Sequence, residues 1–327
     1  MRVQEFEPHR WLGNAHVMTL AGALLPRRTP GLRRTEDRLF EVEPGTRLLA
    51  RCDWQREPRR SPTLAAVHGL EGSSESGYMR GLAALAFAAG FNVLRINQRN
   101  CGGTEGLTAT LYNSGLSADF RAVLFELIER DQLPQIFFAG YSMGGNLILK
   151  MAGELGTARP RELRGVCAVC PTLDLRACVD ALARPENRLY QRHFVRNLKS
   201  RMQRKAKLFP GQFELNGLRR VRTVREFDDA VTAPHCGYGD AANYYQQASA
   251  LRVAQRIAVP TLILTSKDDP VVPFESFEVP ELAGNPQIKI VATDSGGHCS
   301  SISRSRGRER YWAEARVLEF CHAHAEQ

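Results

Sequence analysis

The chain has 327 residues, of which 43% are hydrophobic and 24% charged, which is typical of a globular protein with one large core. No apolar run approaches the roughly 20 residues that a membrane-spanning helix needs. The first ten residues carry Glu5, Glu7 and Arg10 and lack the apolar stretch of a signal peptide. We therefore expect a cytoplasmic protein.

The 8 cysteines are too sparse for a disulfide scaffold and suit reduced thiols. The closest pair with metal-site spacing is Cys167 and Cys170, and no second pair follows at the spacing of zinc ligands. Because this pair lies in an apolar run that is typical of a buried strand, we predict that both residues are core thiols.

Short β-rich runs alternate with helical patterns, which is the signature of βαβ units and a mostly parallel sheet. The first two runs flank Pro44-Gly45, a turn signal, and predict an antiparallel hairpin. We expect strands at residues 39–42, 47–54, 63–67, 91–96, 135–140, 163–169, 261–265 and 288–291. We expect helices at residues 78–89, 116–130, 143–154 and 306–322.

A long gap between residue 171 and about residue 260 breaks this rhythm of strands, and its patterns are mainly helical. We interpret it as a helical lid inserted at the carboxyl edge of the sheet. We expect residues 1–170 and 250–327 to form the core and residues 171–249 to form the lid.

A Gly-x-Ser-x-Gly pattern surrounds Ser142, between a predicted strand and a predicted helix. This arrangement is typical of the nucleophile elbow of the α/β-hydrolase fold. The elbow is a sharp turn, so Gly140 and Gly144 let the strand and the helix approach each other. The alternative is an ordinary glycine-rich turn with a solvated serine. We predict the α/β-hydrolase fold, a mostly parallel central sheet flanked by helices, with Ser142 as nucleophile.

A serine hydroxyl needs a base to take its proton and an acid to orient that base, and in this fold the chain order is Ser, acid, His. Asp268 and Asp269 follow the strand predicted at 261–265, and both are candidates for the acid. We favour Asp269 because it directly precedes a proline; Asp268 would then brace the turn. Two glycines precede His298, which alone among the 8 histidines combines the chain order with a loop after a strand.

An oxyanion hole requires two backbone N–H donors. One is expected from Met143, the residue after the nucleophile, and the other from Leu70, in the loop after the strand at 63–67. His68 and Gly69 would shape that loop, or they would form a simple turn.

Several phrases along the chain carry a family resemblance beyond the serine motif. They are Asn14-Ala-His16, His68-Gly-Leu-Glu-Gly-Ser-Ser74 with Tyr78, Asn97-Gln-Arg99 with Cys101-Gly102, Tyr112-Asn-Ser-Gly115, Gly140-Tyr-Ser-Met-Gly-Gly-Asn146, Phe227-Asp228, Tyr244-Tyr245, Asp268-Asp-Pro270 and Gly296-Gly-His298. On these residues the chain resembles the YheT-like branch of the α/β-hydrolases, which includes bacterial esterases and eukaryotic membrane-anchored lipases. In the family pattern a glycine usually follows Asn-x-Arg, where this chain has Asn100.

The resemblance implies hydrolysis of carboxylic esters with short-to-medium acyl chains, or of lipids. It also implies the triad Ser142, Asp269 and His298, with no metal or organic cofactor. The same triad would equally serve a lipase, phospholipase, thioesterase or amidase, or a peroxide-dependent acyl-transfer side activity, and a binding protein without catalysis is the alternative from another class. The sequence does not indicate an oligomeric state.

The net charge of +9 is concentrated between Arg184 and Arg225, a stretch with 13 Lys and Arg residues and only two Glu residues. Four arginines and a lysine follow one helical face: Arg184, Arg188, Arg192, Arg196 and Lys199. We expect either a solvated helix face or a weak contact with an anionic membrane surface. Nucleic acid is not an expected partner, because the sequence contains no recognition module and no aromatic residues spaced for base stacking.

Overall fold

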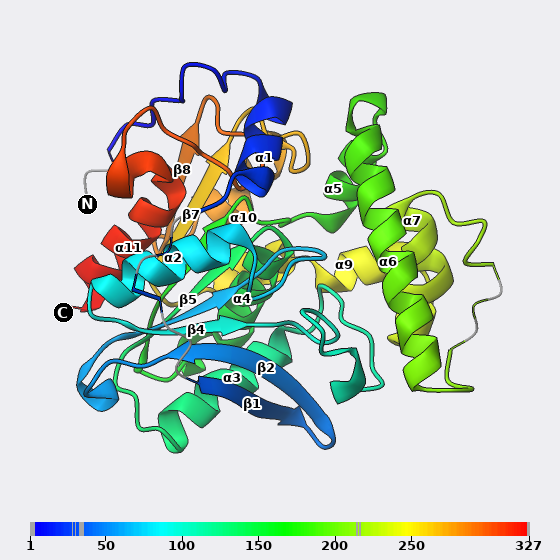
Figure 1. The fold of residues 1–327 in the computed structure, drawn as a ribbon, viewed down its shortest axis with the longest axis horizontal. Helices are drawn as coiled ribbons and strands as arrows, with labels where there is room; N and C mark the ends of the chain where they lie inside the picture. The colour runs from blue at the N-terminus through cyan, green and yellow to red at the C-terminus, as the bar shows by residue number, and fades with distance from the viewer. Residues whose placement is uncertain are drawn as a thin grey trace.

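The computed structural model describes residues 4–27, 29, 31–32, 36–213, 215 and 217–325. Its centre is a sheet of eight strands in the order β1-β2-β4-β3-β5-β6-β7-β8 (Figure 1). β2 pairs antiparallel with β1 and β4, and every other pairing is parallel. The strands are β1 (Glu36–Glu43), β2 (Thr46–Asp53), β3 (Thr63–Val67), β4 (Asn92–Ile96), β5 (Ile136–Tyr141), β6 (Leu163–Val169), β7 (Thr261–Ser266) and β8 (Ile288–Thr293). The predicted hairpin and the mostly parallel sheet are confirmed.

Helices cover both faces of the sheet, which explains why the central strands are apolar throughout. In β3, Leu64 and Ala66 pack on one side, whereas Ala65 and Val67 pack on the other. Helices α2 (Gly77–Ala88) and α11 (Trp312–Ala325) cover the first side, while α3 (Ser117–Glu129), α4 (Met143–Leu155) and the short α10 (Pro280–Ala283) lie on the second. Because strands β3 to β8 pair in parallel, their carboxyl ends meet at one edge of the sheet.

The described part of the stretch between β6 and β7 contains helices and no strand, so the predicted helical insertion is confirmed. Its helices are α5 (Leu175–Leu182), α6 (Arg188–Leu208), α7 (Val224–Phe227), α8 (Ala233–His235) and α9 (Ala241–Ala248). In Figure 1, α6 stands beside the sheet rather than over either face. It buries Val195, Leu198 and Met202 and exposes Arg192 and Arg196, as the amphipathic pattern predicts. The assignment of residues 171–249 as a separate lid remains a prediction.

An N-terminal helix, α1 (Ala15–Leu24), was not anticipated from the sequence. The Asn14 side chain caps it by accepting hydrogen bonds from the N–H groups of His16 and Val17. The helix lies against the loop after β8, where a Cβ added to Gly297 would come within 2.6 Å of the Ala15 carbonyl oxygen. The first helix of the chain thus supports the loop that carries His298.

Asn100 stands where the family pattern has a glycine. The backbone conformation at this position explains why either residue is accepted there. Its φ is +63°, in the left-handed region that glycine adopts freely. Asparagine tolerates this region better than most other residues. The turn after β4 is therefore retained despite the departure from the pattern.

Candidate active site

Ser142 lies between β5 and α4 with φ +52° and ψ −119°, a strained conformation for a residue with a side chain. The flanking glycines explain how the turn is made. A Cβ on Gly140 would lie 2.3 Å from the carbonyl oxygen of Gly144, and one on Gly144 would lie 2.5 Å from that of His68. Because real Cβ atoms do not approach so closely, only glycine fits at either position.

The three residues predicted as a triad come together, although they are far apart in the sequence. The Ser142 hydroxyl lies 2.9 Å from Nε2 of His298, and Nδ1 of the same ring lies 2.8 Å from Oδ2 of Asp269. The Asp269 side chain is fully buried. If Nε2 accepts the hydroxyl proton, Nδ1–H must donate to the carboxylate, so the two contacts define one tautomer.

The neighbouring Asp268 contacts the backbone instead of the imidazole. Its Oδ1 accepts the N–H of Gly297 at 2.9 Å, and Gly297 has φ +59°. Of the two candidate acids, the structure therefore brings Asp269 to the ring, and Asp268 braces the loop that positions the ring.

The charges around the imidazole favour its protonated form. Burial lowers the pKa of His298, but the Asp269 carboxylate and the neighbouring Cys299 outweigh this effect and raise the pKa well above its ordinary value. Burial likewise raises the pKa of the Cys299 thiol, but a hydrogen bond from Cys170 and the imidazolium charge bring the pKa down to about 6. The structure therefore places an acidic thiol beside the candidate base.

The two predicted oxyanion donors lie beside the serine. Leu70 and Met143 both line the pocket that contains Ser142, and neither N–H donates a hydrogen bond within the described part of the chain. A Cβ on Gly69 would come within 3.0 Å of Ser142 Cβ, so the loop lies directly against the hydroxyl-bearing side chain. Both N–H groups are thus left without another acceptor among the described residues, which is what an oxyanion hole requires.

His68 has a structural role in this loop. Its Nδ1–H donates to the Gly69 carbonyl at 2.8 Å, and its Nε2 accepts the N–H of Gln98 at 3.1 Å. Burial lowers the pKa of His68 to about 4, so the ring is neutral at physiological pH. The Tyr78 hydroxyl accepts the Gly69 N–H at 3.1 Å and fixes the loop further.

An ion pair that was not predicted joins the insertion to the oxyanion loop. Arg201 of α6 donates to both carboxylate oxygens of Glu71, at 3.1 and 3.0 Å, and both side chains are nearly inaccessible to solvent. The Tyr112 hydroxyl donates to the same carboxylate. Arg201 belongs to the basic cluster but points inward. The only sequence signal was its place beside Met202 on the buried side of α6.

Thr19 is a second residue that was not predicted from the sequence. Its hydroxyl oxygen accepts the backbone N–H of His298 at 2.9 Å and donates its own proton to the Ala15 carbonyl at 2.7 Å. No motif marks this threonine, because its role depends on how α1 docks against the loop.

A pocket opens on Ser142 between the sheet edge and the insertion, and its lining is predominantly apolar. The apolar lining residues include Leu111, Leu175, Val179, Leu182, Phe194, Leu198, Met202, Val224, Phe227 and Val271. One acid also reaches it: Asp228 accepts the Tyr245 hydroxyl at 2.8 Å. Burial raises the pKa of Asp228 to about 6, and hydrogen bonds from Thr232 and Tyr245 offset only part of that rise. Such a pocket suits an apolar chain joined to a polar reacting group.

Residues 62–305 match the family model described as alpha/beta hydrolase fold, so the chain belongs to the α/β-hydrolase family. It is 32% identical to "Putative esterase YheT" of Escherichia coli (strain K12) over 97% of this chain and 92% of that protein, which assigns it to the YheT-like branch. It is also 27% identical to the phospholipase ABHD3 of Mus musculus, over 81% of this chain and 64% of that protein.

Among solved structures, the esterase Pf2001 of Pyrococcus furiosus matches with a TM-score of 0.59 at 16% identity, covering 99% of each chain. This likeness concerns the fold alone. The chain is thus an α/β-hydrolase related to esterases and phospholipases. Within the described residues, no helix combines the length and the apolar character that crossing a bilayer requires.

Proposed function

We propose that the protein is a serine esterase in which Ser142 is the nucleophile, His298 the general base and Asp269 the acid that orients the imidazole. The observation that carries this proposal is the unbroken pair of hydrogen bonds, 2.9 and 2.8 Å long, that joins the three side chains at an elbow. A buried serine with no catalytic role would not require a strained backbone, a base and an acid that orients the base.

In the proposed reaction, His298 Nε2 takes the Ser142 proton as the hydroxyl oxygen attacks the ester carbonyl. The Asp269 carboxylate stabilises the imidazolium that forms. The N–H groups of Leu70 and Met143 bind the oxyanion. The imidazolium then gives its proton to the departing alcohol, leaving an acyl-enzyme. Water, activated by the same imidazole, releases the acid and restores the serine. These steps need no metal or organic cofactor.

The proposed substrates are carboxylic esters with short-to-medium acyl chains. The apolar lining of the pocket beyond Ser142 supports an acyl chain as the bound group, and the chain length is what the resemblance to the YheT-like branch implies. A phospholipase is the nearest alternative, since a relative bears that name. A thioesterase or an amidase would use the same residues. A panel of oxygen esters, thioesters, amides and phospholipids with matched acyl chains separates these activities, because each requires the same nucleophile but a different leaving group.

The test of the proposal combines p-nitrophenyl esters of increasing chain length with a fluorophosphonate probe. We expect the wild type to hydrolyse the esters and to be labelled, and Ser142→Ala to lose both properties while it remains folded. Ser305→Ala, a serine outside the pocket, is the matched control and should retain both. A wild type that is folded but neither labelled nor active would instead favour a binding protein without catalysis.

The exposed arginines of α6 support a second proposal, which is contact with an anionic lipid surface. Arg188, Arg192 and Arg196 are exposed on α6, which borders the pocket, while Arg184 is exposed but precedes the helix rather than continuing its face. Long-range attraction from such a face would bring the pocket toward an anionic surface that carries ester substrates.

A further inference from the structure

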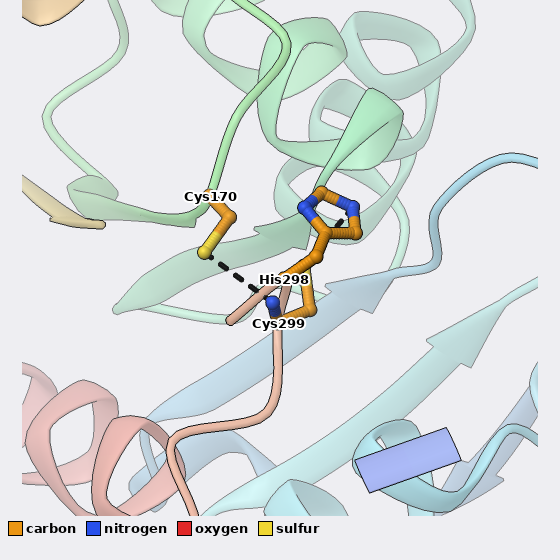
Figure 2. A group of neighbouring side chains, drawn as sticks. All are labelled: Cys170, His298 and Cys299. Carbon is orange, nitrogen blue, oxygen red and sulfur yellow. Dashed lines mark hydrogen bonds between the residues drawn. The ribbon is translucent and has the colours of Figure 1, made fainter. Parts of the chain in front are cut away.

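Two thiols lie beside the candidate base and have no part in the proposed reaction. Cys170 directly follows β6, and Cys299 directly follows His298. The two sulfur atoms and one ring nitrogen of His298 all lie within 4.8 Å of one another (Figure 2). Across the residues that the structure describes, this is the only group of three or more His, Cys, Asp or Glu side chains whose donor atoms gather so closely.

The distance between the donor atoms of Cys299 and His298 fits a tetrahedral metal ion, and the Cys170 sulfur lies within 4.8 Å of both. With Zn–S bonds of about 2.3 Å and Zn–N bonds of about 2.0 Å, tetrahedral ligands lie roughly 3.6 Å apart. Cys299 Sγ lies 3.7 Å from Nε2 of His298. The Ser142 hydroxyl lies 2.9 Å from the same nitrogen, so its oxygen is a candidate for the fourth ligand. The donor set is two sulfurs, one nitrogen and one oxygen, which favours a soft divalent cation such as Zn²⁺.

The backbone holds both sulfur atoms in place. Cys170 and Cys299 have φ of +45° and +55°, which side-chain-bearing residues rarely adopt. The Cys299 N–H donates to Cys170 Sγ at 3.4 Å (Figure 2), and Cys299 Sγ lies 3.5 Å from the Val169 carbonyl. Cys170 therefore differs from Cys167, three residues earlier, whose thiol packs in the core near Cys321. Cys167 and Cys170 are both buried, as predicted for core thiols, but the sulfur of Cys170 also lies beside His298.

We propose that Cys170, His298 and Cys299 form an inhibitory binding site for a soft divalent cation, with Zn²⁺ as the best fit. On binding, the Cys170 thiol and the Cys299–His298 pair release to solvent the protons that they hold, which leaves two thiolates and a neutral imidazole whose Nε2 lone pair binds the metal. That lone pair is the one that would accept the Ser142 proton, so the metal-bound protein cannot activate its nucleophile. The inhibition rests on the proposed esterase activity, whereas the site itself does not.

The site is tested first without any activity assay. Metal-free, reduced protein is titrated with Co²⁺, for which tetrahedral thiolate coordination gives a charge-transfer band in the near ultraviolet. We expect the band in the wild type and in Cys236→Ser, a thiol in the insertion, and its displacement by Zn²⁺. We expect its loss in Cys170→Ser and in Cys299→Ser. Absence of the band, or a band that both variants retain, would overturn the proposal.

A second measurement needs no variant and so does not depend on whether the serine variants fold. X-ray absorption at the zinc edge of the wild-type complex should report two sulfur and two nitrogen or oxygen ligands. A first shell made only of nitrogen and oxygen would place the metal elsewhere and contradict the site.

Inhibition is measured separately on a p-nitrophenyl ester, relative to the metal-free rate of each variant. Zn²⁺ should inhibit the wild type, a chelator should restore the rate, and Cys299→Ser should raise the concentration for half-inhibition about tenfold or more. Equal inhibition of wild type and Cys299→Ser would overturn the inhibitory role. A protein with the cobalt band but no esterase activity would leave the metal site supported and the proposed function refuted, so the two failures are distinguishable.

Discussion

The carboxylate of Asp269 holds the imidazole of His298 with Oδ2, at 2.8 Å, while its Oδ1 accepts the backbone N–H groups of Val271 and Val272 at 2.8 and 3.0 Å. Both oxygens of this buried group are therefore satisfied by donors. The backbone of residues 271–272 thus fixes the orientation of the carboxylate, and the carboxylate fixes the orientation of the ring.

The two adjacent aspartates should differ sharply when each loses its charge. In Asp269→Asn the amide no longer fixes the tautomer that Ser142 requires, so we expect kcat to fall about 10⁴-fold. Asp268→Asn keeps an acceptor for the Gly297 N–H and should cost less than about tenfold. Ester hydrolysis and fluorophosphonate labelling rates measure both changes. A larger loss in Asp268→Asn would exchange the roles of the two acids.

The activity should depend on pH through the imidazole. Only neutral His298 accepts a proton, and its pKa is raised well above the ordinary 6.5, so kcat/KM should climb with pH along a limb that lies above 6.5. Cys299→Ser removes a negative neighbour that raises this pKa, so its limb should move to lower pH. The profiles are measured with chelator present, and Cys236→Ser should leave the limb unchanged. A limb below 6.5 in the wild type would show that burial dominates.

The fold could be predicted from local sequence patterns, because the central strands of a βαβ protein are apolar and its tight turns need glycine. Gly140 and Gly144 indicated a close approach that the structure has, and the chain order of the acid and the base followed from that fold. The helix α1 carried no comparable signal, since its role lies in one contact between Thr19 and the His298 loop. The roles of the triad residues themselves remain a prediction.

The buried position of Arg201 could not be predicted from the pattern of charged residues either. In the sequence it is one of a run of basic residues, and whether an arginine faces solvent or pairs with Glu71 depends on which side of α6 meets the oxyanion loop. A charge run gives the net charge, but burial of one member is decided by tertiary packing. The pairing of Cys170 with Cys299 carries no sequence signal for the same reason, since the two residues are neighbours only in space.

Because Arg201 and Glu71 form a buried ion pair, the effect of substituting one on the free energy of unfolding should depend on whether the other is present. Arg201→Met leaves the Glu71 carboxylate buried without its cation, and we expect a loss of about 3–5 kcal/mol in the free energy of unfolding. Adding Glu71→Gln removes the charge and keeps an acceptor for Tyr112, so the double variant should recover most of that loss. Urea unfolding of the two single variants and the double variant measures the coupling. Simple additivity would show that the pair is not energetically joined.

Because of Asp228, the free energy of unfolding should fall as the pH rises. Burial raises its pKa to about 6 from an ordinary 3.8, so between these values the folded protein retains a proton that the unfolded chain has lost. The free energy of unfolding of the wild type, relative to Asp228→Asn, should therefore fall by on the order of 3 kcal/mol as pH rises from about 4 to above 6. Chemical unfolding across that range tests it; a relative stability that is constant or rises with pH would mean that Asp228 ionises readily in the fold.

The exposed arginines of α6 should bind anionic vesicles in a salt-dependent manner. Binding to phosphatidylglycerol vesicles should weaken steeply as salt is added, because the Debye length shrinks to about 8 Å at physiological ionic strength. Arg192→Glu with Arg196→Glu should weaken binding further, while phosphatidylcholine vesicles should bind neither protein. Co-sedimentation measures all of these. Salt-insensitive binding, or no binding by the wild type, would leave a solvated helix face.

Residues from the beginning of the described chain hold the segment that carries the base. The His9 N–H donates to the Ile302 carbonyl at 3.0 Å, the Trp312 indole donates to the Gln4 carbonyl at 2.8 Å, and Thr19 accepts the N–H of His298. The N-terminal partners in these contacts are synthesised long before residues 298–312. The loop that carries His298 can therefore be fixed by α1 only after this late segment has been synthesised.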